Sequence, residues 1–359
     1  GEQRCRIQPA CLGQRQVLRR IGHRRVELFS PGGIVCCCTH AVVTNDKQNV
    51  RAASHEGCER ASTMQSHYQR MPQEFAMTAA ARIPSHISQK PRHDLKVRHM
   101  DFSFDQSIPT WWYDNDPFKT LLLSALSGGF PEGERFFIES VRHYRDRITD
   151  PALQEAIRAF IGQEGHHSRE HKSLNDFFVA RGLPVDVIDR NVGAFMRWMR
   201  KNLSPERQLA HTVAVEHFTA ILSEGFMLDE AELGKMDERM AKIWAWHAVE
   251  ETEHKAVAFD VYKATVNNEW IRVSEMALVT LLFGGFTAVD HFRLMRSVGK
   301  AGDVKMWLRG MNELWGVPGR FRKMLPAYLD FYRRDFHPSQ HDAGEQLARV
   351  KARYLGDKA

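Results

Sequence analysis

Cysteine is absent from residue 59 to the end of this 359-residue chain, which excludes thiolate chemistry from most of its length. The six cysteines that the chain has are Cys5, Cys11, Cys36, Cys37, Cys38 and Cys58. The adjacent run of three lacks the Cys-x-x-Cys spacing of zinc and iron–sulfur sites, so we interpret the cysteines as incidental. The remaining chain needs no oxidising compartment and can bind metal only through nitrogen and oxygen. We therefore expect a cytoplasmic protein.

Residues 1–76 lack helical and strand periodicity, and no secretory signal peptide is recognisable in them. We interpret them as a disordered or non-native N-terminal extension, with Met64 or Met77 as the natural start. Residues 77–117 are rich in Pro, His and basic residues and are interpreted as an arm or linker.

A basic patch on the remaining chain is also missing. The formal net charge is +6, but residues 1–100 hold 16 Lys and Arg against 7 Asp and Glu, a net +9, which leaves −3 for the rest. A nucleic-acid-binding surface would place its basic residues on the folded domain, interleaved with aromatic residues. The charge pattern therefore argues against a nucleic-acid partner.

Strand patterns are absent from Phe118 onward, where apolar residues recur with the period of a helix. The sequence predicts an all-α domain over residues 118–359, in which a four-helix bundle carries the chemistry and further helices follow at the C-terminal end.

A hydrophobic run long enough to cross a membrane is lacking as well. Met276–Val289 contains 14 uncharged residues, but Gly284-Gly285 interrupts it and it ends at Asp290, whereas a bilayer requires about 20 apolar residues. We expect no transmembrane span and interpret the run as a buried helix. The alternative is that it lines an apolar substrate pocket or makes a peripheral membrane contact.

Glutamate followed three residues later by histidine occurs twice in the chain, at Glu164/His167 and Glu251/His254. On a helix this spacing places the carboxylate and the imidazole on one face, where both can bind a single ion. One such pair is weak evidence. Two pairs, each with a partner glutamate upstream, are much stronger.

The first partner is Glu134, and the chain length between it and Glu164 places the two at one level. The chain runs 13 residues out to Arg147, turns, and returns over 13 residues from Pro151, about 20 Å each way at ~1.5 Å per residue. Asp150 as the N-cap and proline at the first helical position support a helix start there.

The second partner is Glu216, and its half of the chain repeats this arrangement. From Glu216 the chain runs out to Asp229, passes through a loop at Gly234, and returns from Asp237 to Glu251 after 14 residues. The matched lengths predict that both halves bring their carboxylates to the same height in the bundle.

The candidate ligands share their helix faces with apolar residues, whereas Glu139 lies on a solvated face. The alternative interpretation is surface glutamates and core histidines. It is disfavoured because four buried carboxylates without cations would be very costly. We therefore expect two divalent ions; iron suits oxygen and imidazole ligands best, with manganese or zinc as alternatives. The predicted metal ligands are Glu134, Glu164, His167, Glu216, Glu251 and His254.

Two histidines, His171 and His247, lie four residues from a predicted ligand on the same face. Each could be a further ligand or could orient a ligand through a hydrogen bond, and we favour the second role. Glu250 could replace Glu251, but the spacing of the first pair favours Glu251. Three neighbouring residues are expected to be solvated: His166, Glu170 and Glu253.

Four stretches together resemble the bacterial family of predicted metal-dependent hydrolases, which is grouped with the ferritin-like superfamily. They are Phe130–Phe137, Gln163–His167, Glu216–Ala220 and Glu250–Lys255. The similarity runs from about Arg98 to Phe336-His337-Pro338. The resemblance implies a ferritin-like domain with a dinuclear metal site.

Three functions are compatible with such a site. We favour a di-iron oxidoreductase that activates dioxygen and oxidises a small apolar organic substrate, because carboxylate and histidine ligands in a helical bundle resemble di-iron enzymes. The first alternative is a two-metal hydrolase that uses a metal-bound hydroxide. The second is a non-catalytic metal-binding or storage protein, which the extra C-terminal helices disfavour.

Overall fold

The first histidine-bearing helix begins at the capping residue that the sequence predicts. In the computed structural model, which describes residues 95–356, Asp150 caps α3 (Pro151–Ala180). Its side chain accepts a hydrogen bond from the amide of Ala152, one of the helix-terminal amides that have no partner within the helix. The predicted helix start is confirmed.

The described residues form helices and turns, and no strand occurs among them, so the predicted all-α fold is confirmed. The longer helices are α2 (Pro117–Arg142), α3, α4 (Val185–Asn202), α5 (Pro205–Leu222), α7 (Glu238–His254), α8 (Val257–Thr265), α9 (Glu269–Ser297), α10 (Val304–Trp315) and α11 (Arg320–Asp330). The shorter elements are η4 (Arg145–Arg147), η5 (Ser223–Met227), α6 (Glu230–Leu233), η6 (Pro338–Gln340), α12 (Gly344–Val350) and η7 (Lys351–Leu355).

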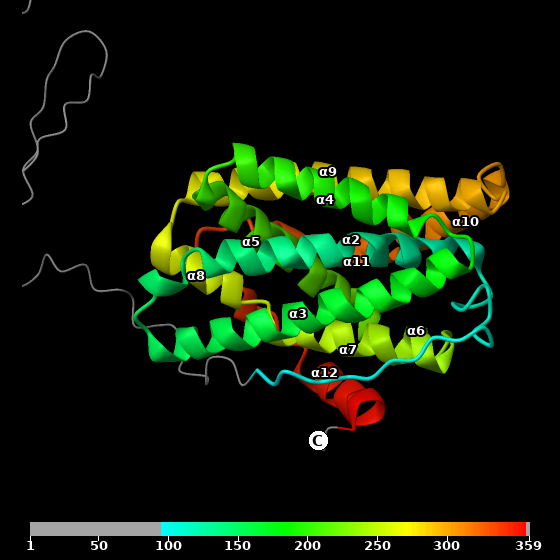
Figure 1. Ribbon diagram of the computed structural model, residues 1–359, viewed down its shortest axis with the longest axis horizontal. Helices are drawn as coiled ribbons and strands as arrows, with labels where there is room; N and C mark the ends of the chain where they lie inside the picture. The colour runs from blue at the N-terminus through cyan, green and yellow to red at the C-terminus, as the bar shows by residue number, and fades with distance from the viewer. Residues whose placement is uncertain (1–94, 357–359) are drawn as a thin grey trace, which may run out of the picture. The chain divides into compact units, whose positions relative to one another are not determined.

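Four helices, α2, α3, α5 and α7, surround the centre of this domain. Both α2 and α7 pack against α3 and against α5, so each of the four has two neighbours within the group. Figure 1 shows α2, α3 and α7 one below the other, with α4 and α9 along the opposite side of α2. This packing joins the two halves of the chain that the sequence predicts to be matched.

The apolar core is divided into two clusters along these helices. In α2, Leu121 and Leu123 belong to one cluster, Phe136 and Val141 belong to the other, and buried Glu134 lies between them in the sequence. The same division recurs in α3 and across α7 and α8. The predicted ligands therefore occupy a polar layer between two apolar layers.

Pro131 interrupts the hydrogen bonding of α2 one turn before Glu134. Because proline has no amide hydrogen, the carbonyl of Ser127 loses its helical partner. The side-chain amide of Asn175, on α3, donates to that carbonyl at 2.9 Å, and Ser168 donates to the carbonyl of Pro131 at 3.0 Å. The interruption thus ties α2 to α3 beside the polar layer.

The turn in the second half is more elaborate than the predicted outward run to Asp229. The α-helix α5 ends at Leu222, the π-helical turn η5 follows, and the short helix α6 precedes α7. Asp237 caps α7 as the predicted start of the return. The extra turns do not alter the outcome, because Glu216 and Glu251 still meet.

The interpretation of Met276–Val289 as a buried helix is wrong. Met276 and Val279 are buried against the core, but Leu281 is 75% exposed and Val289 is 56% exposed. The helix α9 that contains this run packs mainly on α2 and α5. By length and composition alone, it is the one helix among residues 95–356 that could cross a membrane.

Residues 95–116 contain no helix, yet they contribute to the core. Arg98, Ile108, Trp112 and Tyr113 are all buried. The carbonyl of Trp112 also accepts a hydrogen bond from the amide of Asp237 at 2.8 Å. The predictions made for residues 1–76, and for 77–94 of the arm, lie outside the described residues.

Candidate metal centre

The six predicted ligands meet in the polar layer, although they come from four helices. Glu164, Glu216 and His254 each offer an atom within 4.8 Å of the others, and Glu164, His167 and Glu251 do the same. All are buried. Helical spacing brings each Glu-x-x-His pair to one face, and the two turns bring the faces together.

Glu134 joins this cluster through His167 and His247. These three side chains also offer one ligand atom each within 4.8 Å of one another. His247 is therefore placed among the candidate ligands, whereas the sequence favours an orienting role for it. Its Nε2 lies 3.4 Å from Oε1 of Glu251.

His254 faces three carboxylates at once. Its Nε2 lies 3.1 Å from Oε1 of Glu164, 3.3 Å from Oε2 of Glu216 and 3.6 Å from Oε1 of Glu251. The Nδ1 of His167 lies 3.5 Å from Oε1 of Glu251. Nδ1 of His167 also lies 4.0 Å from Oε2 of Glu164, so carboxyl oxygens converge on one nitrogen of each imidazole.

Although these buried atoms lie close to one another, many of them form no hydrogen bond of acceptable geometry within the described residues. The unpartnered atoms include both carboxylate oxygens of Glu134, Glu164 and Glu216, Oε2 of Glu251 and Nε2 of His254. Buried polar groups without a partner are rare and costly. Divalent cations would satisfy them, and the oxygen and imidazole donors fit iron, manganese or zinc.

The two imidazoles are held from the side that faces away from the carboxylate cluster. Nδ1 of His254 is hydrogen-bonded to Oε1 of Gln163 at 3.1 Å, whereas Nε2 of His167 and Oε2 of Glu250 form an ion-pair contact at 3.2 Å without hydrogen-bond geometry. Such partners of the second ring nitrogen orient metal-binding histidines. The sequence did not predict this role for Gln163. Glu250, which the sequence offers as an alternative ligand to Glu251, instead lies beside Nε2 of His167.

The segment before α2 supports both Gln163 and Glu250. The amide of Arg98 donates to Glu250 at 3.2 Å, and its guanidinium donates to both oxygens of Glu253 at 2.8 Å. The side-chain amide of Gln163 donates to the carbonyl of Lys96 at 3.1 Å. No motif in the sequence indicates these contacts, because about 150 residues separate Arg98 from Glu250.

His171 lies behind His247 rather than in the carboxylate cluster. Its Nε2 is 3.0 Å from Nδ1 of His247, and its Nδ1 is 2.9 Å from Oγ of Ser127. The Ser127 hydroxyl donates in turn to Asn175 at 2.7 Å. This chain fixes the ring of His247 and gives His171 the orienting position that the sequence favours.

Two of the expectations for solvated residues are wrong. Glu170 is 7% exposed, and the Glu253 side chain is paired with Arg98 and Lys351. His166 is half-buried beside His99. Glu139, in contrast, has a 45% exposed side chain, as expected.

Burial and mutual repulsion change how the carboxylates bind protons. Burial raises the pKa of Glu134 well above its ordinary value, and burial together with the charge of Glu164 raises that of Glu216 to about 8. Burial also acts on Glu251, but His254 and His167 outweigh it and hold its pKa well below the ordinary value.

The imidazoles respond in the opposite sense. Burial lowers the pKa of His167, but Glu250 and Glu251 outweigh burial and raise it to about 10. The pKa of His254 is likewise raised well above its ordinary value, because Glu251 and Glu216 outweigh burial. The cluster therefore favours positive charge at its centre.

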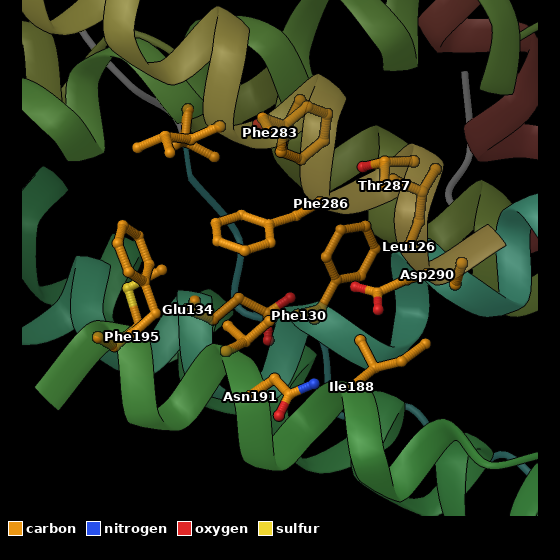
Figure 2. Close-up of a pocket in the computed structure, with 18 of the residues that line it drawn as sticks. Leu126, Phe130, Glu134, Ile188, Asn191, Phe195, Phe283, Phe286, Thr287 and Asp290 are labelled. Carbon is orange, nitrogen blue, oxygen red and sulfur yellow. The ribbon is translucent and has the colours of Figure 1, made fainter. Parts of the chain in front are cut away.

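An apolar cavity of about 260 Å³ reaches the cluster from one side. Glu134, His247 and Glu251 line its inner end, and residues of α2, α4 and α9 form its walls. Figure 2 shows Phe130 and Phe286 close to Glu134, with Asn191 and Asp290 among the few polar groups. An apolar cavity that ends on carboxylates and imidazoles is typical of a site for small organic molecules.

Fold and site together define an all-helical protein with a buried glutamate–histidine cluster suited to divalent metals. A family model described as "Predicted metal-dependent hydrolase" matches residues 96–342, which include every residue of the cluster. The chain belongs to this family. Comparisons with curated proteins and with solved structures give no match.

Proposed function

We propose that this chain is a two-metal hydrolase that acts on a small apolar organic substrate. We propose further that its metal site lies in a ferritin-like four-helix bundle. The observation that carries the proposal is the layer of buried, unpartnered carboxylate oxygens that opens into an apolar cavity. The family match favours hydrolysis over the oxidation that the ligand types alone suggest. The ferritin-like assignment is supported by the order in which the four ligand-bearing helices pack.

The side chains fall into two groups around a shared pair of carboxylates. Glu216 and His254 would hold one ion and Glu134 and His167 the other, while Glu164 and Glu251 lie near both imidazoles. His247 is close enough to join the second group. Two divalent ions bound here would polarise a carbonyl or phosphoryl oxygen and lower the pKa of a water molecule.

The residues around the cavity position the substrate and limit access of water. Phe130, Phe283 and Phe286 enclose its apolar part, and Thr219 and His211 also line it. Asp290 and Arg293 form an ion pair in its wall. We expect the apolar part of a substrate to lie among the phenylalanines, with its cleavable polar group at Glu134.

Oxidation by a di-iron centre is the second candidate. The cavity favours it because a lining with few hydrogen-bond donors would keep water away from an oxidant. A storage role is disfavoured, since storage does not require an apolar cavity that ends at the ligands. The identity of the metal in native protein helps to distinguish hydrolysis from oxidation.

The test combines metal analysis with two assays on protein purified without added metal. We expect two divalent ions per chain, hydrolysis of aliphatic esters or amides, and no substrate-dependent oxygen consumption. Glu164→Gln and Glu251→Gln should each lose at least one ion. Their turnover should fall by about 100-fold or more, which is the order of loss when one preorganised electrostatic contact is removed from an active site.

Glu139→Gln is the matched control, because it removes an exposed carboxylate from the same bundle. It should keep both ions and full activity. Substrate-dependent oxygen consumption by the ferrous protein, without hydrolysis, would replace the proposal with oxidation. Retention of two ions by Glu164→Gln and Glu251→Gln would refute the ligand assignment itself.

A further inference from the structure

The water-facing side of α9 carries no charge over four turns. Between Glu275 and Asp290 every residue is uncharged, and the exposed ones include Leu278, Leu281 and Val289. A helix on the surface of a globular protein usually presents charged residues to water. Contiguous exposed apolar surface of this kind marks a contact with a partner or a membrane.

Two neighbouring helices extend this surface. Exposed apolar residues follow one stripe of α10, at Val304, Leu308, Met311 and Trp315, and Leu325 and Leu329 are exposed on α11. Their spacing of three and four residues places those of α10 on one face. We call the exposed apolar residues of α9, α10 and α11 the apolar face.

The three helices are joined by a second cavity of about 340 Å³. Gly284 and Ala288 of α9, Met311 and Trp315 of α10, and Leu325 of α11 line it, and each of these residues is exposed. The cavity therefore opens where the apolar residues of all three helices come together.

The chain around the apolar face is strongly basic. Residues 291–325 contain eight Lys and Arg against two Asp and Glu, a formal charge of +6. Residues 101–359 together carry a formal charge of −3, so residues 101–290 and 326–359 together carry −9. Three of these basic residues are paired with carboxylates outside residues 291–325, namely Arg293 with Asp290, Arg309 with Asp116 and Arg320 with Glu232. Arg296, Lys305, Arg322 and Lys323 are exposed in the same stretch as the exposed apolar side chains. An anionic lipid surface attracts both kinds of group, by about 1 kcal/mol for each Lys or Arg near it.

We propose that the apolar face binds the surface of a bilayer that contains anionic lipids. Leu281, Leu308 and their neighbours enter the region between head groups and acyl chains. The exposed basic residues Arg296, Lys305, Arg322 and Lys323 contact the head groups. Exposed Trp270 and Trp315, at an end of α9 and of α10, suit the interfacial region where tryptophan is enriched.

The structure favours a surface contact over insertion of α9 across the membrane. The uncharged stretch of 14 residues spans about 21 Å, whereas the hydrocarbon core is about 30 Å thick. Arg272 before the stretch is buried and donates to the carbonyl of Arg333 at 2.9 Å, and Glu275 is paired with Arg207. These contacts hold α9 against the domain.

The contact also suggests where an apolar substrate enters, a step that rests on the proposed function. The second cavity shares Leu126, Phe283 and Thr287 with the cavity that ends at Glu134. A chain-like apolar molecule leaving the bilayer would meet the second cavity first. Membrane lipids or molecules dissolved among their chains are therefore the substrate class that this route favours.

Vesicle binding tests the contact without requiring any turnover. The full-length protein is sedimented with vesicles of phosphatidylcholine alone or of phosphatidylcholine with phosphatidylglycerol. We expect binding to the anionic vesicles that weakens at high salt, and at least tenfold weaker binding to phosphatidylcholine. Leu281→Asp and Leu308→Asp should each weaken binding at least tenfold, because a charge replaces an inserted side chain.

Val179→Asp, on α3, is the matched control, since Val179 is also an exposed apolar residue but lies outside the apolar face. Circular dichroism verifies that all variants are folded. No binding by wild type, or equal binding by Leu281→Asp and Leu308→Asp, overturns the proposal. A dimer in lipid-free solution that either variant dissociates would assign the face to a second copy of the chain. Binding without hydrolysis would uphold the contact and count against the proposed function alone.

Discussion

His167 and His254 lie in the same cluster but are held by chemically different partners. Glu250 can carry a negative charge at the outer nitrogen of His167, whereas the partner of His254 is the neutral amide of Gln163. An anionic partner makes an imidazole a stronger donor to a metal than an amide does. The two halves of the centre are therefore similar in ligands and unequal in their surroundings.

Glu250→Gln tests this difference at the scale of one residue. The substitution preserves size but removes the charge beside His167, so we expect the affinity for the ion that His167 would hold to fall about tenfold. Titration of metal-free protein with ferrous, manganous or zinc ions measures it. Glu139→Gln should leave both affinities unchanged, and an unchanged affinity in Glu250→Gln would show that Glu250 does not support the site.

At the scale of elements, a cluster of polar contacts connects the segment before α2, the short helix α6 and the start of α11. The hydroxyl of Tyr113 donates to Glu232 at 2.6 Å, and Arg320 and Lys235 pair with the other carboxylate oxygen, each at 2.6 Å. Burial raises the pKa of Glu232, but these partners outweigh burial and lower it to about 2.

This cluster should make stability depend on pH. The folded-state pKa of Glu232 lies below that of an unfolded glutamate, so its contribution is present above about pH 4.5 and is lost as pH falls toward 2. Because Glu232 is buried but its partner Lys235 has a 42% exposed side chain, screening by water limits the contribution, and we expect about 1 kcal/mol. Denaturant unfolding at pH 6 and pH 3 measures it. Glu232→Gln should flatten this part of the profile, and an unchanged profile would contradict the assignment.

The helix α9 shows how far composition can determine the environment of an element. The run Met276–Val289 indicates an apolar helix correctly, but burial requires neighbours on every side. In the structure α9 packs mainly on α2 and α5, and Leu281 and Val289 are left exposed. The apolar pattern of one helix does not indicate which of its faces another helix will cover.

At the scale of the whole domain, the polar layer separates two apolar clusters that the metal ions would hold together. Each of the helices α2, α3, α5 and α7 contributes a buried glutamate to the layer, so electrostatic repulsion among these carboxylates acts on all four helices. Cations that remove this repulsion should therefore stabilise the entire domain rather than one helix.

Metal removal tests this coupling. An ion present at 100 times its Kd stabilises the folded state by about 2.7 kcal/mol, which corresponds to roughly 5–10 °C in Tm for a domain of this size. We expect a chelator to lower Tm by that amount and added divalent ion to restore it. Thermal unfolding followed by circular dichroism measures both. A Tm that does not respond to the chelator in metal-loaded protein would contradict a site in the core.

The sequence by itself determined the helical class and predicted the six candidate ligands, which the structure brings together from α2, α3, α5 and α7. These depend on helical periodicity and on the lengths of outward and return runs, which are local properties of the chain. Only the tertiary structure decided that His247 joins the candidate ligands, that Gln163 and Glu250 hold the imidazoles, that Arg98 supports them, and that α9 is exposed. The physical reason is that these contacts join segments far apart in the chain, whose distance and orientation no local pattern specifies.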